Sequence, residues 1–216
     1  MTRTRVRDEV VGLMIALAAY VSGSAAAAAE GAMIPEGHRG NCAMCHGKQP
    51  ANTYVFDVAR SIVIVRFIGS GPPLAALAER IRGGFVFDVA QPDHSSVTAE
   101  FDADAIKSPD GLVTNFLRSS EFLDSQRFPT IRFVSSSIKK QDDQRYRIAG
   151  DLTVHGSTAP LQLDATFEGA GSDPVYATKY ASFHAAGDLS CKDFGIVLCT
   201  AADKIRMEIF VVGSQR

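Results

Sequence analysis

The chain has 216 residues, of which 46% are apolar and 21% charged, so it can pack one domain and is not a disordered chain. Its 22 Lys and Arg against 24 Asp and Glu give a formal charge of −2, which excludes the basic surplus that nucleic-acid binding requires. Eighteen Gly, thirteen Phe and no Trp, with frequent Val, Ile and Thr, favour a sheet-rich fold.

Residues 1–29 have the pattern of a secretory signal peptide. Three arginines precede an apolar run from Val10 to Val21, and an alanine tract follows and ends at Ala29. The run is shorter than the roughly twenty residues that span a bilayer as a helix, and small residues suit signal peptidase. We therefore expect cleavage after Ala29 and a periplasmic location, with an uncleaved membrane anchor as the alternative.

The next segment, residues 30–53, is irregular and contains the motif Cys42-Ala43-Met44-Cys45-His46. The C-x-x-C-H spacing is the attachment signature of haem c, because two thiols reach the two vinyl groups and the next imidazole lies under the iron. The motif also resembles small c-type cytochromes. We expect Cys42 and Cys45 to hold the haem and His46 to be its proximal metal ligand. A Cys42–Cys45 disulfide or thiol redox pair, and a structural zinc site, are the alternatives.

A segment as short as residues 30–53 cannot wrap a haem in a domain of its own, because it buries too little surface. The porphyrin would rest on the remaining chain, on a redox partner protein or on a second subunit of a homodimer. The distal ligand stays open among Met33, His38, His94 and His184, and an open coordination position is a further alternative. A thioether in that position would raise the potential relative to an imidazole.

Residues 54–216 form the second part of the chain and have the pattern of strands. Apolar and polar residues alternate over 97–102, 161–167 and 205–211, which is the period of two of half-buried strands. Residues 62–67 and 85–89 are nearly continuous apolar runs. With the turn signals between them, the sequence predicts about eight strands that pair sequentially and antiparallel.

Two stretches of this region predict short helices. Pro72 and Pro73 precede apolar residues at helical spacing up to Arg80, and residues 112–123 place several apolar side chains on one face. The predicted fold is therefore all-β: an eight-stranded antiparallel barrel with one or two short helices against its rim. Such a barrel has no exposed sheet edge and can hold one small ligand, whereas a packed β-sandwich is the alternative.

Four phrases in the later strands resemble the YceI-like family, lipocalin-like barrels of the bacterial periplasm that bind polyisoprenoid lipids. They follow one another in the family's order and spacing over roughly Tyr54 to Val212, at residues 117–124, 128–133, 150–158 and 193–195. The resemblance implies an extended apolar tunnel for an isoprenoid chain, such as the tail of a quinone or of a carrier lipid.

The chain departs from the family pattern at three places. Arg60-Ser61 replaces the usual His-Ser pair of the first strand, Cys191-Lys192 replaces an arginine before Asp193-Phe194-Gly195, and the first hairpin carries an insertion over 69–80. Polar residues at the rim would select the head group of a lipid, whereas an apolar lining accepts many tails. The head-group contacts therefore stay open.

A bound tail needs a continuous apolar wall, for which no short motif exists. We expect this wall to be lined by Phe85, Phe87, Phe101, Phe116, Phe122, Phe133, Leu163 and Phe167. For each of them, ordinary core packing is the alternative.

Two cysteines lie outside the C-x-x-C-H motif. Cys191 and Cys199 are close enough in sequence to form a hairpin disulfide in an oxidising compartment, and two reduced, buried thiols are the alternative.

We find no catalytic constellation in the sequence, because nucleophile-elbow and phosphate-loop motifs are absent. Asp151 and His155 would share a face of one strand but lie about 13 Å apart, at about 3.3 Å per residue, which is too far for an acid–base pair. We therefore do not expect an enzyme.

The favoured hypothesis is an exported barrel that binds an isoprenoid or quinone, carries one covalent haem c and serves electron transfer. The alternative is a non-redox polyisoprenoid carrier or stress-response binding protein in which Cys42 and Cys45 form a disulfide. A haem-based sensor with an open distal site is the third.

Overall fold

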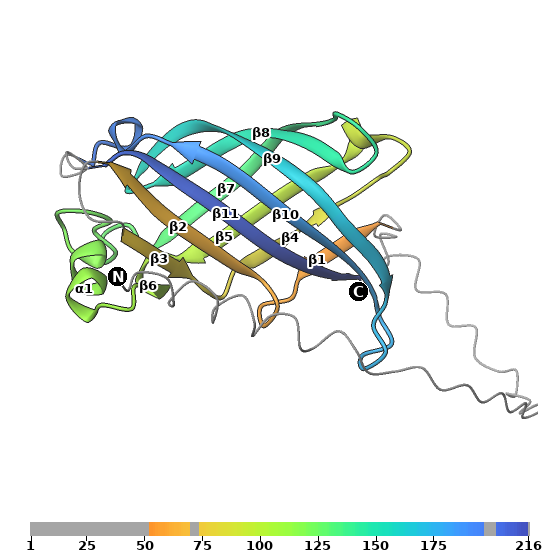
Figure 1. Ribbon diagram of the computed structural model, residues 1–216, viewed down its shortest axis with the longest axis horizontal. Coiled ribbons are helices and arrows are strands. Elements are labelled where there is room, and N and C mark those ends of the chain that lie inside the picture. Colours follow the sequence, from red (N-terminus) through yellow and green to blue (C-terminus); the bar gives the residue numbers. More distant parts are fainter. Residues whose placement is uncertain (1–51, 70–73, 197–201, 216) are drawn as a thin grey trace, which may run out of the picture. The chain divides into compact units, whose positions relative to one another are not determined.

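The computed structural model describes residues 52–69, 74–196 and 202–215. Their strands form one antiparallel sheet that curls into a barrel (Figure 1). The strands are β1 (Thr53–Phe56), β2 (Ile62–Gly69), β3 (Leu74–Ala78), β4 (Arg82–Val86), β5 (Ser96–Asp102), β6 (Ile106–Lys107), β7 (Thr130–Lys140), β8 (Arg145–Val154), β9 (Ser157–Ser172), β10 (Lys179–Leu189) and β11 (Ala202–Gln215). The helices are α1 (Gly111–Arg118) and the 3-10 turns η1 (Pro92–His94), η2 (Ala103–Ala105) and η3 (Cys191–Phe194).

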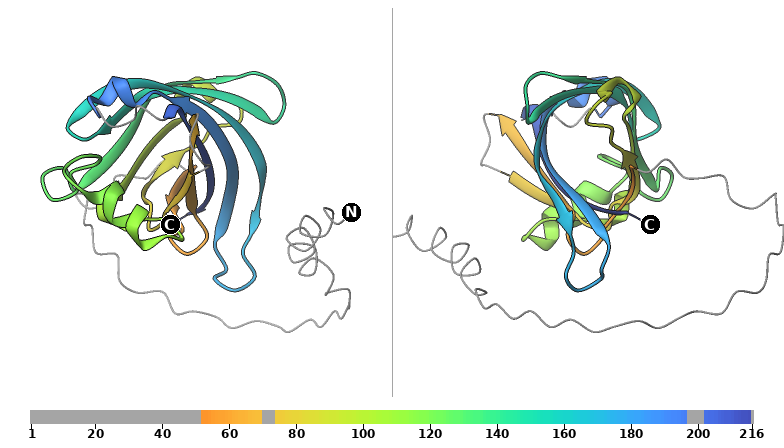
Figure 2. Two further views of the ribbon diagram at one scale, coloured as in Figure 1. Left: turned by 60° about the vertical axis from the view of Figure 1, so that its left-hand side comes forward. Right: turned by 90° about the vertical axis from the view of Figure 1, so that its right-hand side faces the viewer.

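Eight strands close the barrel in the order β1, β4, β5, β7, β8, β9, β10 and β11, and β11 pairs with β1 to complete the ring (Figure 2). The predicted eight-stranded antiparallel barrel is confirmed. Strand β11 is long enough to pair with β1 through its last residues and with β2 through most of the rest. On its other side β2 pairs with β3, and β3 pairs with β6. The short strands β1 and β2 therefore share one position in the wall, beside β11.

Local polar chemistry produces the break between β1 and β2. The carboxylate of Asp57 accepts hydrogen bonds from the backbone N–H groups of Ala59, at 3.0 Å, and Arg60, at 3.3 Å, which turns the chain sharply. Another tight turn joins β8 to β9, where His155 and Gly156 adopt φ of 51° and 73°. Two consecutive residues with positive φ are the mark of a type I′ hairpin turn, whose twist matches that of the strands.

The predicted helix over 72–80 is wrong, because β3 occupies Leu74–Ala78. Alternate residues Ala76 and Ala78 are buried, as in a strand, and β3 pairs antiparallel with β2. The leucine spacing is compatible with a helix, but hydrogen bonds to the neighbouring strand decide the conformation.

The second predicted helix is present over a shorter range. Helix α1 begins after Asp110, whose side chain accepts a hydrogen bond from the N–H of Leu112 at 2.8 Å. Leu117 of α1 is 1% exposed and packs on the barrel core, whereas Leu112 is 81% exposed. Within the described part of the chain, no helix has the length and hydropathy of a membrane span.

Candidate ligand cavity

The barrel interior contains an apolar cavity, here called cavity 1. Its empty volume, counted together with the open space at its mouth, is about 920 Å³. No polar atom is exposed on its wall. It is lined by Phe56, Val63, Ile81, Phe85, Val86, Phe87, Ser96, Val97, Ala99, Phe101, Phe133, Ile138, Tyr146, Ile148, Leu152, Leu161, Leu163, Ala165, Phe183, Ala185, Met207, Ile209 and Val211.

A cluster of aromatic rings forms part of this wall. The ring of Phe87 lies 5.3 Å from Tyr146, 4.9 Å from Phe183 and 5.5 Å from Phe167, and Phe85 lies 5.3 Å from Phe183. Most of these pairs are edge-to-face, a geometry that favours aromatic contact. The cluster therefore gives cavity 1 a wall whose rings hold one another in place.

Two glycines make room for these rings. A Cβ atom at Gly150 would lie 2.6 Å from Cζ of Phe133, and one at Gly213 would lie 2.5 Å from Cε1 of Phe85. Both distances are shorter than any tolerable carbon–carbon contact, so the two rings occupy the space that a side chain would fill. The missing side chains of Gly150 on β8 and Gly213 on β11 thus leave room for the rings of Phe133 and Phe85, which line cavity 1.

A second apolar cavity, cavity 2, has an empty volume of about 600 Å³ on the same basis. It lies toward the end of the barrel where α1 is found, because Leu117 of α1 and three residues at η3 line it (Figure 1). Its lining residues are Val65, Phe67, Ala76, Phe101, Ile106, Leu117, Phe122, Leu123, Ile131, Leu152, Val154, Leu189, Cys191, Phe194, Ile196, Ile205 and Met207.

The structure brings most of the residues expected to line a tunnel to these cavities. Phe85, Phe87, Phe133 and Leu163 line cavity 1, Phe122 lines cavity 2, and Phe101 lines both. Their contact with a ligand stays a prediction.

Phe116 and Phe167 line neither cavity. Phe116 lies on the outer part of α1 and is 39% exposed, because the buried face of this helix is centred on Leu117. Phe167 is partly buried, and its ring packs against Phe87 and Phe183 without forming part of the wall. The contact expected between these two residues and a ligand stays a prediction.

Sequence reasoning missed several lining residues, among them Phe56, Tyr146 and Phe183. A signal for two of them exists. Tyr146 and Ile148 alternate with arginines in β8, and Phe183 belongs to a series of every second residue in β10 that includes Ala181 and Ala185. The small alanines hide this alternation, because they give little contrast in hydropathy.

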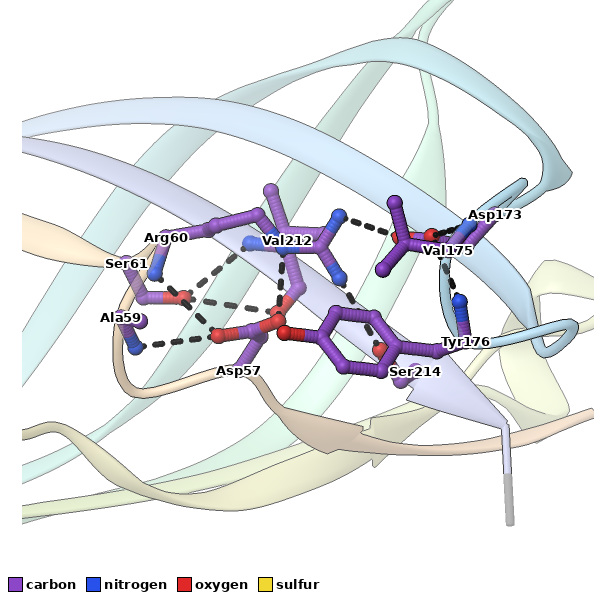
Figure 3. A network of polar contacts seen from close by, with 9 residues as sticks. All are labelled: Asp57, Ala59, Arg60, Ser61, Asp173, Val175, Tyr176, Val212 and Ser214. Atoms are coloured by element: carbon purple, nitrogen blue, oxygen red, sulfur yellow. Dashed lines mark hydrogen bonds and ion pairs between the residues drawn. The ribbon is translucent and has the colours of Figure 1, made fainter.

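Arg60, one of the departures from the family pattern, joins two turns at one end of the barrel (Figure 3). Its Nε donates to Asp57 at 2.6 Å, Nη1 to Asp173 at 2.7 Å and Nη2 to Ser214 at 3.5 Å. The next residue, Ser61, is buried and accepts a hydrogen bond from the N–H of Val212 at 3.1 Å. All three guanidinium nitrogens thus bind protein groups, so Arg60 fastens the β1–β2 turn to the β9–β10 turn.

Asp173 is the central acceptor of the β9–β10 turn. Its pKa is lowered from the usual value, first by hydrogen bonds from the backbone N–H groups of Val175 and Tyr176, at 2.9 and 3.1 Å, and then by Arg60. The pKa of Arg60 is raised, chiefly by its hydrogen bond with Asp57. The network therefore favours the charged forms of both partners.

The residues proposed to bind haem, Cys42, Cys45 and His46, lie outside the described residues, as do Met33 and His38. His94 is exposed in η1, and His184 lies on β10 with its ring stacked at 4.5 Å on Phe210. Among the described residues, no group of three or more His, Cys, Asp or Glu could hold a metal ion. The haem site stays a prediction from the motif.

The predicted disulfide partners are Cys191 and Cys199. Cys191 is buried in η3, whereas Cys199 lies outside the described residues, so their pairing stays a prediction. Asp151 is exposed in β8, and His155 lies in the β8–β9 turn with its ring 4.9 Å from Phe128. These positions give no support to an acid–base pair.

A closed antiparallel barrel with an apolar interior defines a lipocalin-like protein. The model of the YceI-like domain matches residues 54–212, so the chain belongs to the YceI-like family.

Three similar proteins illustrate the match. A UPF0312 protein of Pseudomonas putida strain F1 is 36% identical over 53% of this chain and 59% of its own length. The crystal structure of Burkholderia cenocepacia BcnA has a TM-score of 0.65 at 18% identity, covering 73% of this chain and 98% of that one. A polyisoprenoid binding domain from Saccharophagus degradans, implicated in plant cell wall breakdown, has a TM-score of 0.53 at 8% identity, covering 76% and 98%.

The chain spans about three fifths of the length of the Pseudomonas relative. The structural likenesses concern the fold alone, since their identities are low.

Proposed function

We propose that the barrel binds the isoprenoid tail of a lipid, such as a quinone or a carrier lipid, without itself carrying out redox chemistry. The observation that carries this proposal is cavity 1, which exposes no polar atom on its wall and so offers a hydrocarbon chain an apolar surface. The name of the Saccharophagus neighbour supports the same ligand class.

The apolar wall favours recognition of the tail over recognition of the head group. Burying hydrocarbon stabilises by about 0.8 kcal/mol per CH₂, so one five-carbon unit gains about 4 kcal/mol at most. Association costs about 4–15 kcal/mol in lost freedom of motion. One isoprene unit therefore offsets at most the lower end of that cost, and a tail of several units is needed for stable binding.

A plug in the wall tests the proposal. Ala185 faces cavity 1, so Ala185→Phe should fill part of it, whereas the next residue, Ala186, lines neither cavity and provides the matched control Ala186→Phe. Binding of geranylgeraniol, a prenol of four isoprene units, is measured by native mass spectrometry and by competition with a fluorescent lipid probe. We expect at least tenfold weaker binding by Ala185→Phe and a change below twofold in the control. Equal binding by both variants would refute the proposal.

Covalent haem and electron transfer form a second candidate function, because the motif Cys42 to His46 is present in the sequence. The motif precedes the matched YceI-like domain, so the family match lends it no support. If haem were bound, Cys42 and Cys45 would form the thioethers and His46 would ligate the iron. An intact-mass measurement on protein from a host that attaches haem decides between this and the Cys42–Cys45 disulfide, since the adduct is heavier than the bare chain.

We also propose export to the periplasm, because residues 1–29 have the pattern of a signal peptide. The same mass spectrum should show a chain that begins at Glu30. A mass that includes residues 1–29 would instead support an uncleaved anchor.

A further inference from the structure

The two cavities lie end to end along the strands of the barrel. On β8, Tyr146 and Ile148 line cavity 1, Leu152 lines both cavities, and Val154 lines cavity 2. Along this single strand the side chains line first cavity 1 and then cavity 2, and Leu152 lies at the boundary between the two cavities.

Strand β11 shows the same succession in the opposite chain direction, as expected for an antiparallel barrel. Val211 and Ile209 line cavity 1, Met207 lines both cavities, and Ile205 lines cavity 2. From Val211 to Ile205 the strand advances by about 20 Å at about 3.3 Å per residue. The two cavities together therefore extend over a length that suits a long chain and exceeds a compact ligand.

Strand β5 contributes the third side chain at the boundary. Val97 and Ala99 line cavity 1, whereas Phe101, farther along the same strand, lines both cavities. Phe101, Leu152 and Met207 are the only residues common to both sets of lining residues in the described chain. We call these three residues the partition.

We propose that the partition is an internal gate, and that a long isoprenoid tail displaces it to occupy both cavities while a short tail occupies one. The proposal rests on the proposed function and adds a determinant of tail length to it. Among the three residues, Met207 is the side chain that yields, because methionine is unbranched and has three rotatable bonds. Phe101 has a rigid ring and Leu152 a branched side chain, so these two form the fixed part of the gate.

The gain from opening the gate comes from cavity 2. Met207 and Leu152 line both cavities, so each side chain borders a cavity on two sides although both are buried in the core. Each isoprene unit that passes the gate buries further hydrocarbon against the apolar wall of cavity 2. A tail that reaches beyond the partition therefore binds more tightly than one that stops before it.

Three variants of the full chain test the gate. Met207→Ala removes the yielding side chain, Met207→Phe replaces it with a rigid ring, and Ile209→Ala is the control that enlarges cavity 1 without touching the partition. The probes are linear all-trans prenols of three and nine isoprene units, and the readout is the ratio of their dissociation constants. We expect Met207→Phe to weaken binding of the nine-unit prenol at least tenfold and that of the three-unit prenol less than twofold. Met207→Ala should favour the longer prenol, and Ile209→Ala should leave the ratio unchanged.

A fourth variant guards against loss of folding. Met207→Leu nearly keeps the side-chain volume, so the variant should fold as the wild type does. Its branched side chain should slow association of the nine-unit prenol, measured by stopped flow, and leave the three-unit prenol unaffected. A ratio unchanged in Met207→Phe, or an unchanged association rate in Met207→Leu, would overturn the gate. If the wild-type chain binds neither prenol, the proposed function itself fails. If it binds both prenols and the Met207 variants leave the ratio unchanged, only the gate fails, so the two failures are distinguishable.

Discussion

The aromatic wall of cavity 1 should carry a large share of the stability of the barrel. Phe87 is 8% exposed and its ring contacts Tyr146, Phe167 and Phe183. Three ring contacts at about 0.5–1.5 kcal/mol each amount to about 1.5–4.5 kcal/mol, and Phe→Ala in a core costs about 3–5 kcal/mol. Because one side of the ring borders the cavity and lacks packing partners, we expect Phe87→Ala to cost about 3 kcal/mol.

Urea unfolding followed by circular dichroism measures this loss. With a slope of about 2 kcal/mol per molar urea, a loss of about 3 kcal/mol lowers the midpoint by about 1.5 M. Phe116→Ala is the matched control, because Phe116 is 39% exposed and has one ring contact, with Phe122, so its loss should stay below about 1 kcal/mol. Equal losses in the two variants would refute the role of the aromatic cluster.

Two further predictions concern turns. Asp173 has a lowered folded-state pKa, so its contribution to stability is present above about pH 4 and declines as the pH falls through that lowered value. In urea titrations from pH 7 to pH 2, Asp173→Asn should therefore be less stable than the wild type at pH 7, and the difference should shrink in acid; a constant difference would contradict this. Gly156 has φ of 73° and a Cβ there would lie 2.5 Å from Cε1 of Phe128, so Gly156→Ala should cost about 1–3 kcal/mol in the same assay. Gly111→Ala, with no atom within 4 Å of the added Cβ, should be neutral or stabilising, and similar losses at both positions would exclude the turn as the cause.

Strand alternation made much of the fold predictable. In β9 the odd residues from Leu161 to Ala165 are buried and their neighbours exposed, so the sequence carries the orientation of each side chain. The same holds for Ile205 and Met207 in β11. Alternation works here because one face of each strand meets the apolar interior and the other meets water.

The errors occur where local pattern and tertiary pairing disagree. Over Leu74–Ala78 the apolar residues fit both periodicities, and pairing with β2, which no local pattern reveals, selects the strand. The exposure of Phe116 is also invisible in a local pattern, because it depends on how α1 packs on the barrel, where the residue is 39% exposed. The partition between the cavities is likewise invisible in sequence, because Phe101, Leu152 and Met207 come from three distant strands.

The closing pair of the barrel has a consequence for biosynthesis. Tyr54 on β1 lies opposite Gln215 on β11, so the first and last described strands complete the wall together. Contacts between residues so distant in sequence form slowly, because a long loop must close before they are made. The β1–β11 pairing can therefore form only after β11 has been synthesised, and deletion of residues 213–215 would remove the strand pairs that close the ring while leaving the pairing of β11 with β2.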